Sequence, residues 1–288
     1  MFLYACRRLN PDFVLIENVP GLISLSKGDA IEKIKKELLD LGYFVDYMIL
    51  QAAHYGAPQN RWRLIITGSR RANFRFPTPT HFSSMKPNIA GGRSLTFQTN
   101  GEFGLFESYK PTTTVWDAIS DLPNLENGGG FLEVDYTSKP KSSFQSTARL
   151  DAEKLFNHQA QKLGELNFQR IKHIHEGENW QALPLELIPQ NIKGSAEKWG
   201  RFTPTRFGRL RKSGQFTTIL TKPEPYWGAF IHPNQNRLIS AREASRAQCF
   251  PDKTRFFGNL SSQYRQIGNA VPLSISHALG LAIQEHFC

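Results

Sequence analysis

A short apolar run that stops at a turn constrains the fold of this chain most. Residues 13–16 (FVLI) are wholly apolar and lead directly into Glu17 and Asn18, followed by Val-Pro-Gly at 19–21. Such runs, bounded by turn residues, are typical of parallel strands that are covered on both faces. We therefore expect a buried parallel strand that presents a carboxylate and an amide at its C-terminal end, where open α/β sheets bind ligands. The alternative is that Glu17 only caps the following turn.

The residues up to 70 continue this pattern of strands and helices. Asp29 and Glu32 have the spacing of a capping box at the start of a helix that Gly42 ends. Strands are predicted at 43–50 and 63–67, with a loop containing Gly and Pro between them. Strand, helix, strand, strand is part of a layered α/β sheet, but a complete sheet usually has about five or six strands. Residues 1–70 are therefore predicted to form only part of such a sheet.

Residues 71–236 have a different composition. Gly, Pro, Ser, Thr and aromatic residues are frequent there, and long helical periodicities are few. Residues 139–222 contain 15 Lys and Arg against 7 Asp and Glu, so this part carries most of the formal net charge of +10. A basic surface favours a polyanionic partner, most simply nucleic acid. We expect an irregular α+β lobe here, followed at 237–288 by helices that return to the first lobe.

Several classes of protein are excluded by what the 288 residues lack. Cys6, Cys249 and Cys288 are too few and too scattered for a disulfide-stapled scaffold or a CxxC motif. His173 and His175 have no third ligand at metal spacing, so we predict no metal site, and without a P-loop NTP hydrolysis is unsupported. No apolar run approaches the roughly 20 residues that span a bilayer, and two arginines follow the apolar N-terminus at once. These features predict an intracellular soluble protein.

Two arginines mark the start of the last predicted strand in the first lobe. The segment 59–70 (QNRWRLIITGSR) places Arg61 and Arg63 two residues apart, so both side chains point to the same side of a strand. Two guanidinium groups on one side favour an anionic or carbonyl-rich partner. A solvated strand edge would give the same spacing, and the sequence alone leaves both alternatives open.

The last fifty residues contain two further motifs. The segment 237–252 (RLISAREASRAQCFPD) begins a helix with a capping box and then places Arg242 and Arg246 one turn apart, which is typical of a structural helix. The segment 264–272 (YRQIGNAVP) places Asn269 and Ala270 just before a helix N-terminus, where free N–H groups can hold a polar ligand. Taken alone, such a helix start is usually only a cap.

Together and in this order, four motifs resemble the DNA cytosine-5 methyltransferase family. They are ENV at 17–19, QxRxR at 59–63, RExxRxQxFPD at 242–252 and GNxVP at 268–272, with weaker similarity across 112–123, 175–184 and 208–223. The resemblance implies a partial Rossmann-like methyltransferase sheet joined to a target-recognition lobe. It also implies methyl transfer from S-adenosyl-L-methionine to C5 of a cytosine flipped out of double-stranded DNA. We expect this activity in a restriction–modification system, in a prokaryotic cytoplasm.

The resemblance assigns roles to individual residues. Glu17 would hold the N3/N4 edge of the cytosine and favour protonation at N3. Arg63 would contact O2, while Arg61 would help to place the site and the DNA backbone. Asn269 and Ala270 would lie against the cofactor. Three arginines of the remaining chain would contact DNA, namely Arg206, Arg209 and Arg242.

The sequence departs from the family in two motifs that carry chemistry. Neither the FxGxG cofactor loop nor the Pro-Cys-Gln nucleophile loop occurs in these 288 residues, and Cys6 stands in the sequence ACRR. A cysteine thiolate that adds to C6 makes C5 nucleophilic, so we predict that the isolated chain is inactive. A separate N-terminal half that carries both loops would complete it. A truncated gene product, a non-catalytic DNA-binding subunit and an RNA-methylating relative are the alternatives.

Overall fold

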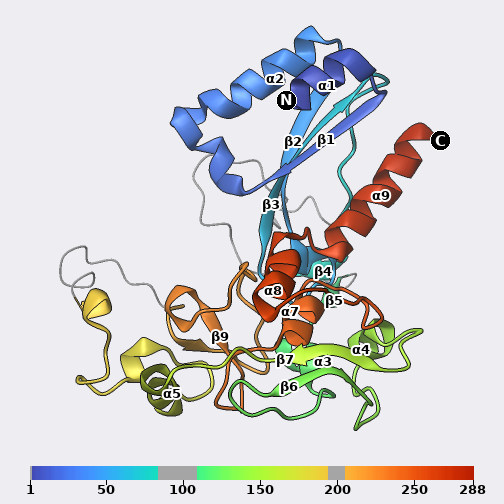
Figure 1. The fold of residues 1–288 in the computed structure, drawn as a ribbon. Helices are drawn as coiled ribbons and strands as arrows, with labels where there is room; N and C mark the ends of the chain where they lie inside the picture. Colours follow the sequence, from blue (N-terminus) through green and yellow to red (C-terminus); the bar gives the residue numbers. More distant parts are fainter. Residues whose placement is uncertain (1, 84–108, 194–204) are drawn as a thin grey trace. The chain divides into compact units, whose positions relative to one another are not determined.

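The chain divides into two compact units (Figure 1). The computed structural model describes residues 2–83, 109–193 and 205–288. The first unit contains Met1–Gly56, Arg61–Thr112 and Ser274–Cys288, and the second contains Ala57–Asn60 and Thr113–Leu273. The predicted segment 237–288 is therefore shared, because only its last helix belongs to the first unit.

A three-stranded sheet with the order β1-β3-β2 forms the centre of the first unit. The strands are β1 (Phe13–Asn18), β2 (Phe44–Gln51) and β3 (Trp62–Ser69), and β3 is antiparallel to both neighbours. The parallel pairing predicted for residues 13–16 is therefore wrong. The physical reason is that β3 follows β2 through a short connection, runs antiparallel to it and lies between β2 and β1, which run in the same direction. Within the described residues, β1 pairs with no second strand.

One glycine lets the three strands approach closely. Gly68 on β3 lies opposite Val14 on β1 and Val45 on β2. A Cβ atom at this position would lie 2.7 Å from Cγ2 of Val14 and 3.2 Å from Cβ of Tyr43. A larger residue would therefore push β1 or the residues before β2 away from the central strand.

The helix α2 (Asp29–Asp40) covers the sheet with an apolar face. Ile31 and Leu38 are buried in the same cluster as residues of β1 and β3. The predicted capping box is absent: the N-cap residue is Gly28, at φ 101°, and makes no side-chain cap hydrogen bond. Asp29 is instead the first helical residue, where its negative charge interacts favourably with the positive end of the helix dipole.

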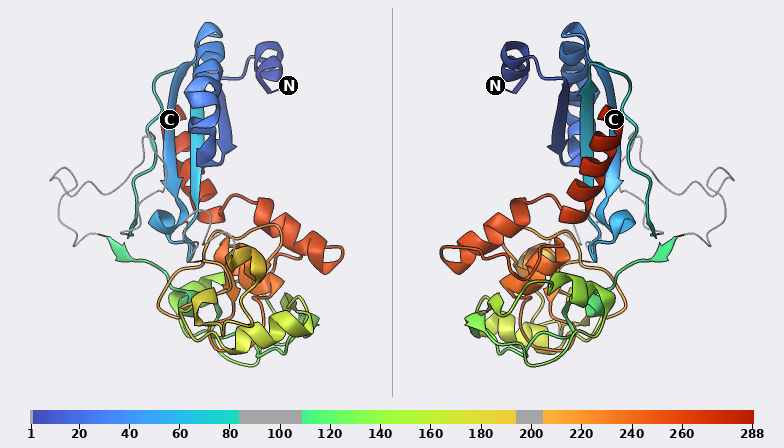
Figure 2. Two further views of the ribbon diagram at one scale, coloured as in Figure 1. Left: turned by 90° about the vertical axis from the view of Figure 1, so that its left-hand side faces the viewer. Right: turned by 90° about the vertical axis from the view of Figure 1, so that its right-hand side faces the viewer.

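Two further helices belong to the first unit, α1 (Phe2–Leu9) and α9 (Leu273–Phe287). Figure 2 shows α9 beside the sheet, and its last turn makes the specific contacts. His286 Nε2 lies 2.7 Å from Ser69 Oγ at the end of β3, and its ring is 6.0 Å from that of Phe13 on β1. The C-terminal helix is thus fixed to strand ends by a hydrogen bond and by aromatic packing.

Short elements complete the first unit. They are the 3-10 turns η1 (Pro20–Ile23), η2 (Leu25–Gly28) and η3 (Ala52–Tyr55), and the parallel pair β4 (His81–Phe82) and β5 (Lys110–Pro111).

The second unit is irregular, with short strands and helices. The two strand pairs are β6–β7, which is antiparallel, and β8–β9, which is parallel. Its elements are α3 (Val115–Ile119), β6 (Gly130–Val134), α4 (Ser143–Ala148), β7 (Leu155–Gln159), α5 (Glu165–Lys172), η5 (Trp180–Ala182), β8 (Gly208–Arg209), η6 (Pro225–Trp227), β9 (Ala229–Ile231), α7 (Ala241–Ala247) and α8 (Leu260–Asn269).

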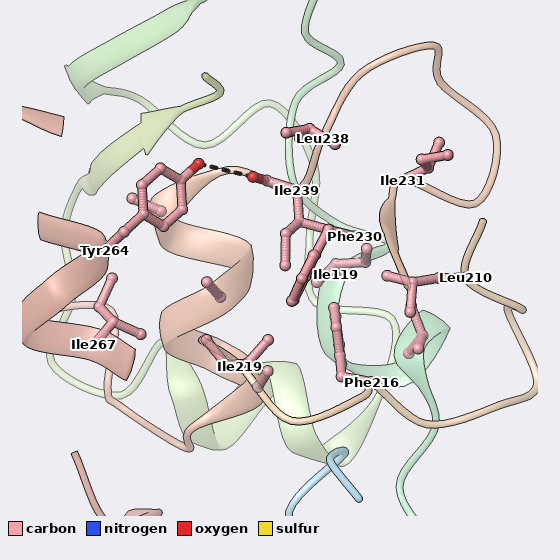
Figure 3. Packing of buried hydrophobic residues seen from close by; sticks show 14 of the residues in the cluster. Ile119, Leu210, Phe216, Ile219, Phe230, Ile231, Leu238, Ile239, Tyr264 and Ile267 are labelled. Atoms are coloured by element: carbon pink, nitrogen blue, oxygen red, sulfur yellow. Dashed lines mark hydrogen bonds between the residues drawn. The ribbon is translucent and has the colours of Figure 1, made fainter. Parts of the chain in front are cut away.

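The core of the second unit surrounds α7, all seven residues of which are buried (Figure 3). Ser240 and Glu243 form the predicted capping box at its start, which is confirmed. Phe216, Phe230 and Tyr264 pack in the same cluster, and the Tyr264 hydroxyl donates a 2.8 Å hydrogen bond to the carbonyl of Ile239. The one polar atom of a large buried ring is thereby satisfied.

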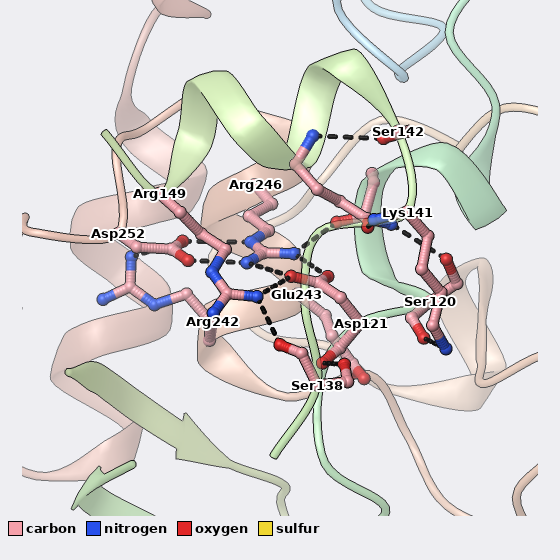
Figure 4. Close-up of polar contacts among 12 residues, drawn as sticks. Ser120, Asp121, Ser138, Lys141, Ser142, Arg149, Arg242, Glu243, Arg246 and Asp252 are labelled. Atoms are coloured by element: carbon pink, nitrogen blue, oxygen red, sulfur yellow. Dashed lines mark hydrogen bonds and ion pairs between the residues drawn. The ribbon is translucent and has the colours of Figure 1, made fainter. Parts of the chain in front are cut away.

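Arg246 of α7 forms a buried ion-pair network (Figure 4). Its guanidinium binds Asp252 through Nε at 3.0 Å and Nη2 at 2.6 Å, and Asp121 through Nη1 at 2.5 Å. Burial alone would raise the pKa of Asp252, but the hydrogen bond and charge of Arg246 outweigh it and lower that pKa. Arg149 also binds Asp121, at 3.2 Å. The structural role that the sequence favoured for this helix agrees with these contacts.

Candidate functional site

Glu17 and Arg63 meet on one face of the first unit's sheet. Glu17 lies opposite Ile65 in the register of β1 and β3, and Arg63 is two residues from Ile65, on the same face of β3. Nε of Arg63 lies 2.7 Å from Oε1 of Glu17. The Glu17 side chain keeps 29% of its surface exposed and that of Arg63 keeps 10%, so a ligand can reach the carboxylate. Asn18 instead turns back, and its Oδ1 accepts a hydrogen bond from the N–H of Val19.

The two arginines of QxRxR differ in exposure and in charge balance. Burial lowers the pKa of Arg63, while the charge and hydrogen bond of Glu17 oppose that shift. Burial and the nearby Arg63 charge lower the pKa of Arg61 to about 9, so Arg61 remains a cation at neutral pH. Only 2% of Arg61 is exposed. Arg61 therefore lies inside the unit, and its role in placing the site and the DNA backbone stays a prediction.

The predicted cofactor residues lie at the C-terminal end of α8 in the second unit. Asn269 ends α8 and is exposed, whereas Ala270 is extended, at φ −71° and ψ 148°. Gly268 fixes the position of this turn, because a Cβ atom there would lie 2.5 Å from the carbonyl carbon and oxygen of Leu220. The exposed amide of Asn269 can donate and accept hydrogen bonds, as binding the polar end of a cofactor requires.

Two buried glutamines hold this turn, and sequence reasoning missed both. Gln248 donates through Nε2 to the carbonyls of Ile267, at 2.8 Å, and Ala270, at 3.3 Å. Gln59 donates through Nε2 to Oε1 of Gln248 at 3.0 Å, and its own Oε1 accepts from the N–H of Ile219 at 2.8 Å. Both side chains are fully buried. The available signal was their place inside QxRxR and RxQxFPD, where the predictions had considered only the charged residues.

Two of the three arginines predicted to contact DNA lie inside the second unit. Arg209 is 6% exposed, and its guanidinium donates to four backbone carbonyls and to Oδ1 of Asn236. Arg242 is 0% exposed and donates to the carbonyls of Phe156, Pro251 and Thr254. These contacts favour a structural role for Arg209 and Arg242, because backbone carbonyl groups already accept from their donors, and the DNA contact of both residues stays an untested prediction. Arg206 is only partly buried and remains a candidate.

The sequence of this chain matches a known protein family. Residues 2–285 match the C-5 cytosine-specific DNA methylase family. The chain is a member of this family. Over 305 residues it is 35% identical to DNA (cytosine-5)-methyltransferase 1A of Oryza sativa subsp. japonica, a match that covers 99% of this chain and 20% of that protein. It is 29% identical over 349 residues to DNA (cytosine-5)-methyltransferase 1 of Mus musculus, covering 98% and 21%. The chain spans about a fifth of the length of these curated relatives.

A solved structure supports the fold. It is described as a 'putative DNA modification methyltransferase encoded within prophage' (E. coli), and it matches this chain with a TM-score of 0.63 at 21% identity. The match covers 99% of this chain and 72% of the other. The mixed α/β architecture of this methylase chain is therefore shared with a methyltransferase structure.

The cysteines of this methylase chain differ in environment. Cys6 lies on α1 and is 5% exposed, and burial raises the pKa of its thiol. Cys249 follows α7 with a left-handed backbone at φ 62°, and Cys288 is the exposed last residue. A raised pKa disfavours the thiolate, so Cys6 lacks the environment of an activated nucleophile.

None of the helices within residues 2–83, 109–193 and 205–288 combines the length and apolar character needed to cross a membrane. No group of three or more His, Cys, Asp or Glu side chains in those ranges could hold a metal ion.

Proposed function

We propose that this chain carries the cytosine-binding part of a DNA cytosine-5 methyltransferase that uses S-adenosylmethionine. The contact between Glu17 and Arg63 is the observation that carries the proposal. The N4, N3 and O2 positions of cytosine follow one another along a single edge of the ring. A carboxylate that accepts from N4–H, and from N3–H once N3 is protonated, beside a guanidinium that donates to O2, matches this edge.

These two residues act on the charge that develops during attack at C6. Addition of a thiolate to C6 moves electron density onto N3 and O2. The Glu17 carboxylate favours protonation of N3 from solvent, because its negative charge accepts a hydrogen bond from the N3–H that forms. The Arg63 guanidinium donates a hydrogen bond to O2 and so stabilises the increased charge there. Its position on β3 orients the guanidinium before the base binds. The mutual ion pair of the two residues keeps both in place before the base arrives.

Asn269 and Ala270 are the residues of this chain that would hold S-adenosylmethionine. The exposed Asn269 side chain and the turn held by Gln248 fit a polar ligand at this position. When bound, S-adenosylmethionine supplies the electrophilic methyl group. Gln248 positions the turn from inside the unit and does not itself reach a ligand, because it is fully buried.

The nucleophilic thiol comes, in this proposal, from a segment that contains the Pro-Cys-Gln and FxGxG motifs. None of the three cysteines in this chain stands in such a motif. The edge of β1 that no described strand occupies provides a backbone surface to which a further strand of that segment can pair. The restriction–modification setting and the prokaryotic cytoplasm stay predictions, and the relatives by sequence named above come from a plant and a mouse.

A methyl-transfer assay tests the proposal. Radiolabelled S-adenosylmethionine and unmethylated genomic DNA are incubated with the purified chain, with the complementary N-terminal segment, and with both together. We expect no C5 methylation by either part and clear methylation by the mixture. Turnover by the chain alone would refute the need for an external thiol. DNA binding without methylation by the mixture would instead support a non-catalytic DNA-binding subunit, which the basic second unit and the missing motif also favour.

A further inference from the structure

An exposed indole on the second unit has no role in the chemistry described so far. Trp227 ends η6 and is 61% exposed, whereas Trp62, Trp116 and Trp180 are each partly buried. Exposure of a single ring is common at protein surfaces, so the groups that surround Trp227 decide whether it forms a contact site.

The backbone holds this indole in a defined position. The N–H of Trp227 donates to the carbonyl of Glu224 at 3.0 Å, which closes the turn. The next residue is Gly228, where a Cβ atom would lie 2.8 Å from the ring of Phe230, a buried core residue. The turn is therefore packed closely against the core, which fixes the position from which the Trp227 ring projects.

A cation and a second ring lie beside the indole. The ring of Tyr226 is edge-on to that of Trp227, with centroids 4.9 Å apart and planes at 89°. The guanidinium of Arg206 lies over the Tyr226 ring, with its Cζ 4.4 Å from the ring centroid. The N–H of Phe207 donates to the carbonyl of Pro225 at 2.5 Å, which joins the two segments that supply these side chains. Among the described residues, Arg206 makes no ion pair with a carboxylate.

The chemistry of the cluster formed by Trp227, Tyr226 and Arg206 indicates which class of ligand it can bind. An exposed ring beside an uncompensated guanidinium matches a nucleotide, which offers a flat aromatic face and a negative phosphate. The surrounding sequence has the same charge preference, because residues 139–222 carry 15 basic against 7 acidic side chains. Acidic peptides would use the charge but leave the indole exposed.

We propose that Trp227 stacks on an unstacked base of the DNA and that Arg206 interacts with the adjoining phosphate. This inference rests on the proposed function, since it assigns a DNA contact to the second unit. Every base presents an aromatic face, so the contact contributes affinity and positioning rather than sequence recognition.

Fluorescence anisotropy of labelled DNA measures the contribution of the ring. The full chain is titrated with an intact duplex and with the same duplex carrying one unpaired base. Trp227→Ala is expected to weaken binding about 5- to 150-fold, the range measured for loss of one base–aromatic stack. The loss should be larger for the DNA with the unpaired base, and Trp227→Phe should recover most of the affinity.

Two controls separate stacking from charge and from folding. Phe131→Ala removes another exposed ring of the same unit, 49% exposed on β6, and should leave affinity unchanged. Trp227→Ala removes no charge, so the salt dependence should keep its slope, whereas Arg206→Gln should reduce the slope by about one. Unchanged affinity of Trp227→Ala, with DNA still bound, would overturn the stacking contact alone. Failure of the unsubstituted chain to bind either DNA would overturn both this inference and the proposed DNA-binding function.

Discussion

Replacing Arg246 by methionine tests whether the buried ion pairs determine the stability of the second unit. The substitution keeps a long side chain of similar reach and removes the charge from a site where Arg246, Asp121 and Asp252 all have fully buried side chains. Arg149 at 3.2 Å would remain beside Asp121, and Arg242 at 3.6 Å beside Asp252. Each carboxylate would lose its shorter contact, so neither would be fully compensated.

The size of the effect follows from this partial loss. Removing one partner of a buried pair typically costs about 3–5 kcal/mol, because the remaining charge is left buried. Here two carboxylates are affected but each keeps a second arginine, so we expect a loss of about 3 kcal/mol in the free energy of unfolding. Asp252 also accepts a 2.8 Å hydrogen bond from the Tyr136 hydroxyl, which limits the penalty further.

Urea denaturation followed by circular dichroism and tryptophan fluorescence gives the measurement. Lys154→Met is the matched control, since Lys154 pairs with Glu133 at 2.9 Å but both side chains are nearly half exposed. The control should leave the unfolding midpoint unchanged. If Arg246→Met were as stable as the unsubstituted chain, the ion pairs would not be a source of stability and the reasoning would fail. If the variant did not fold, Asp252→Asn would give a smaller loss that can still be measured.

Three further predictions concern single positions. Gly268→Ala should destabilise the chain by roughly 1–3 kcal/mol, because its Cβ would lie 2.5 Å from the Leu220 backbone. Gly280→Ala in α9 should stabilise it by up to about 1 kcal/mol, because no neighbouring atom lies within 4 Å of its Cβ position. Thermal unfolding checks both signs. Cys249→Gly should be neutral or slightly stabilising and Cys249→Val should be destabilising, since φ is 62° and branched residues avoid that region; equal denaturation midpoints would contradict this. Burial lowers the pKa of His54 to about 4, below the 6.5 of an unfolded chain, so its contribution to stability is complete above pH 6.5 and falls by about 3 kcal/mol as pH drops to 4. His54→Gln should flatten that part of the pH profile, and an unchanged profile would refute the assignment.

Local sequence patterns were sufficient for elements whose signals are local. The Ser240–Glu243 capping box starts α7 as predicted, and the apolar run at 13–16 does form β1. The convergence of Glu17 and Arg63 was implied by the family resemblance and not by spacing, and the pairing of β1 with β3 brings the two side chains together. In each case the deciding interactions lie within a few residues of one another or within one strand pair.

Features decided by distant segments were not accessible in the same way. The direction of β1 depends on which strand becomes its neighbour, and an apolar run favours burial and a parallel sheet without identifying that neighbour. Arg209 is buried because loops at 171–174 and 232–236 bring carbonyl oxygens around it. An arginine in a basic segment looks like a surface residue until those acceptors are known. The contact between Gln59 and Gln248 joins residues 189 positions apart and left no periodic signal.

Methylation by the completed enzyme with Glu17→Gln tests the central claim most directly. The chain and its complementary N-terminal segment are mixed, and the rate of C5 methylation is compared with that of Glu32→Gln, an exposed glutamate on α2 that pairs with Lys35. Glutamine keeps the shape of the side chain but lacks the negative charge that favours protonation of N3, so Glu17→Gln should lower the rate about 10²- to 10⁴-fold while the Glu32 variant remains fully active. An unchanged rate in Glu17→Gln would show that this carboxyl group does not act on the cytosine.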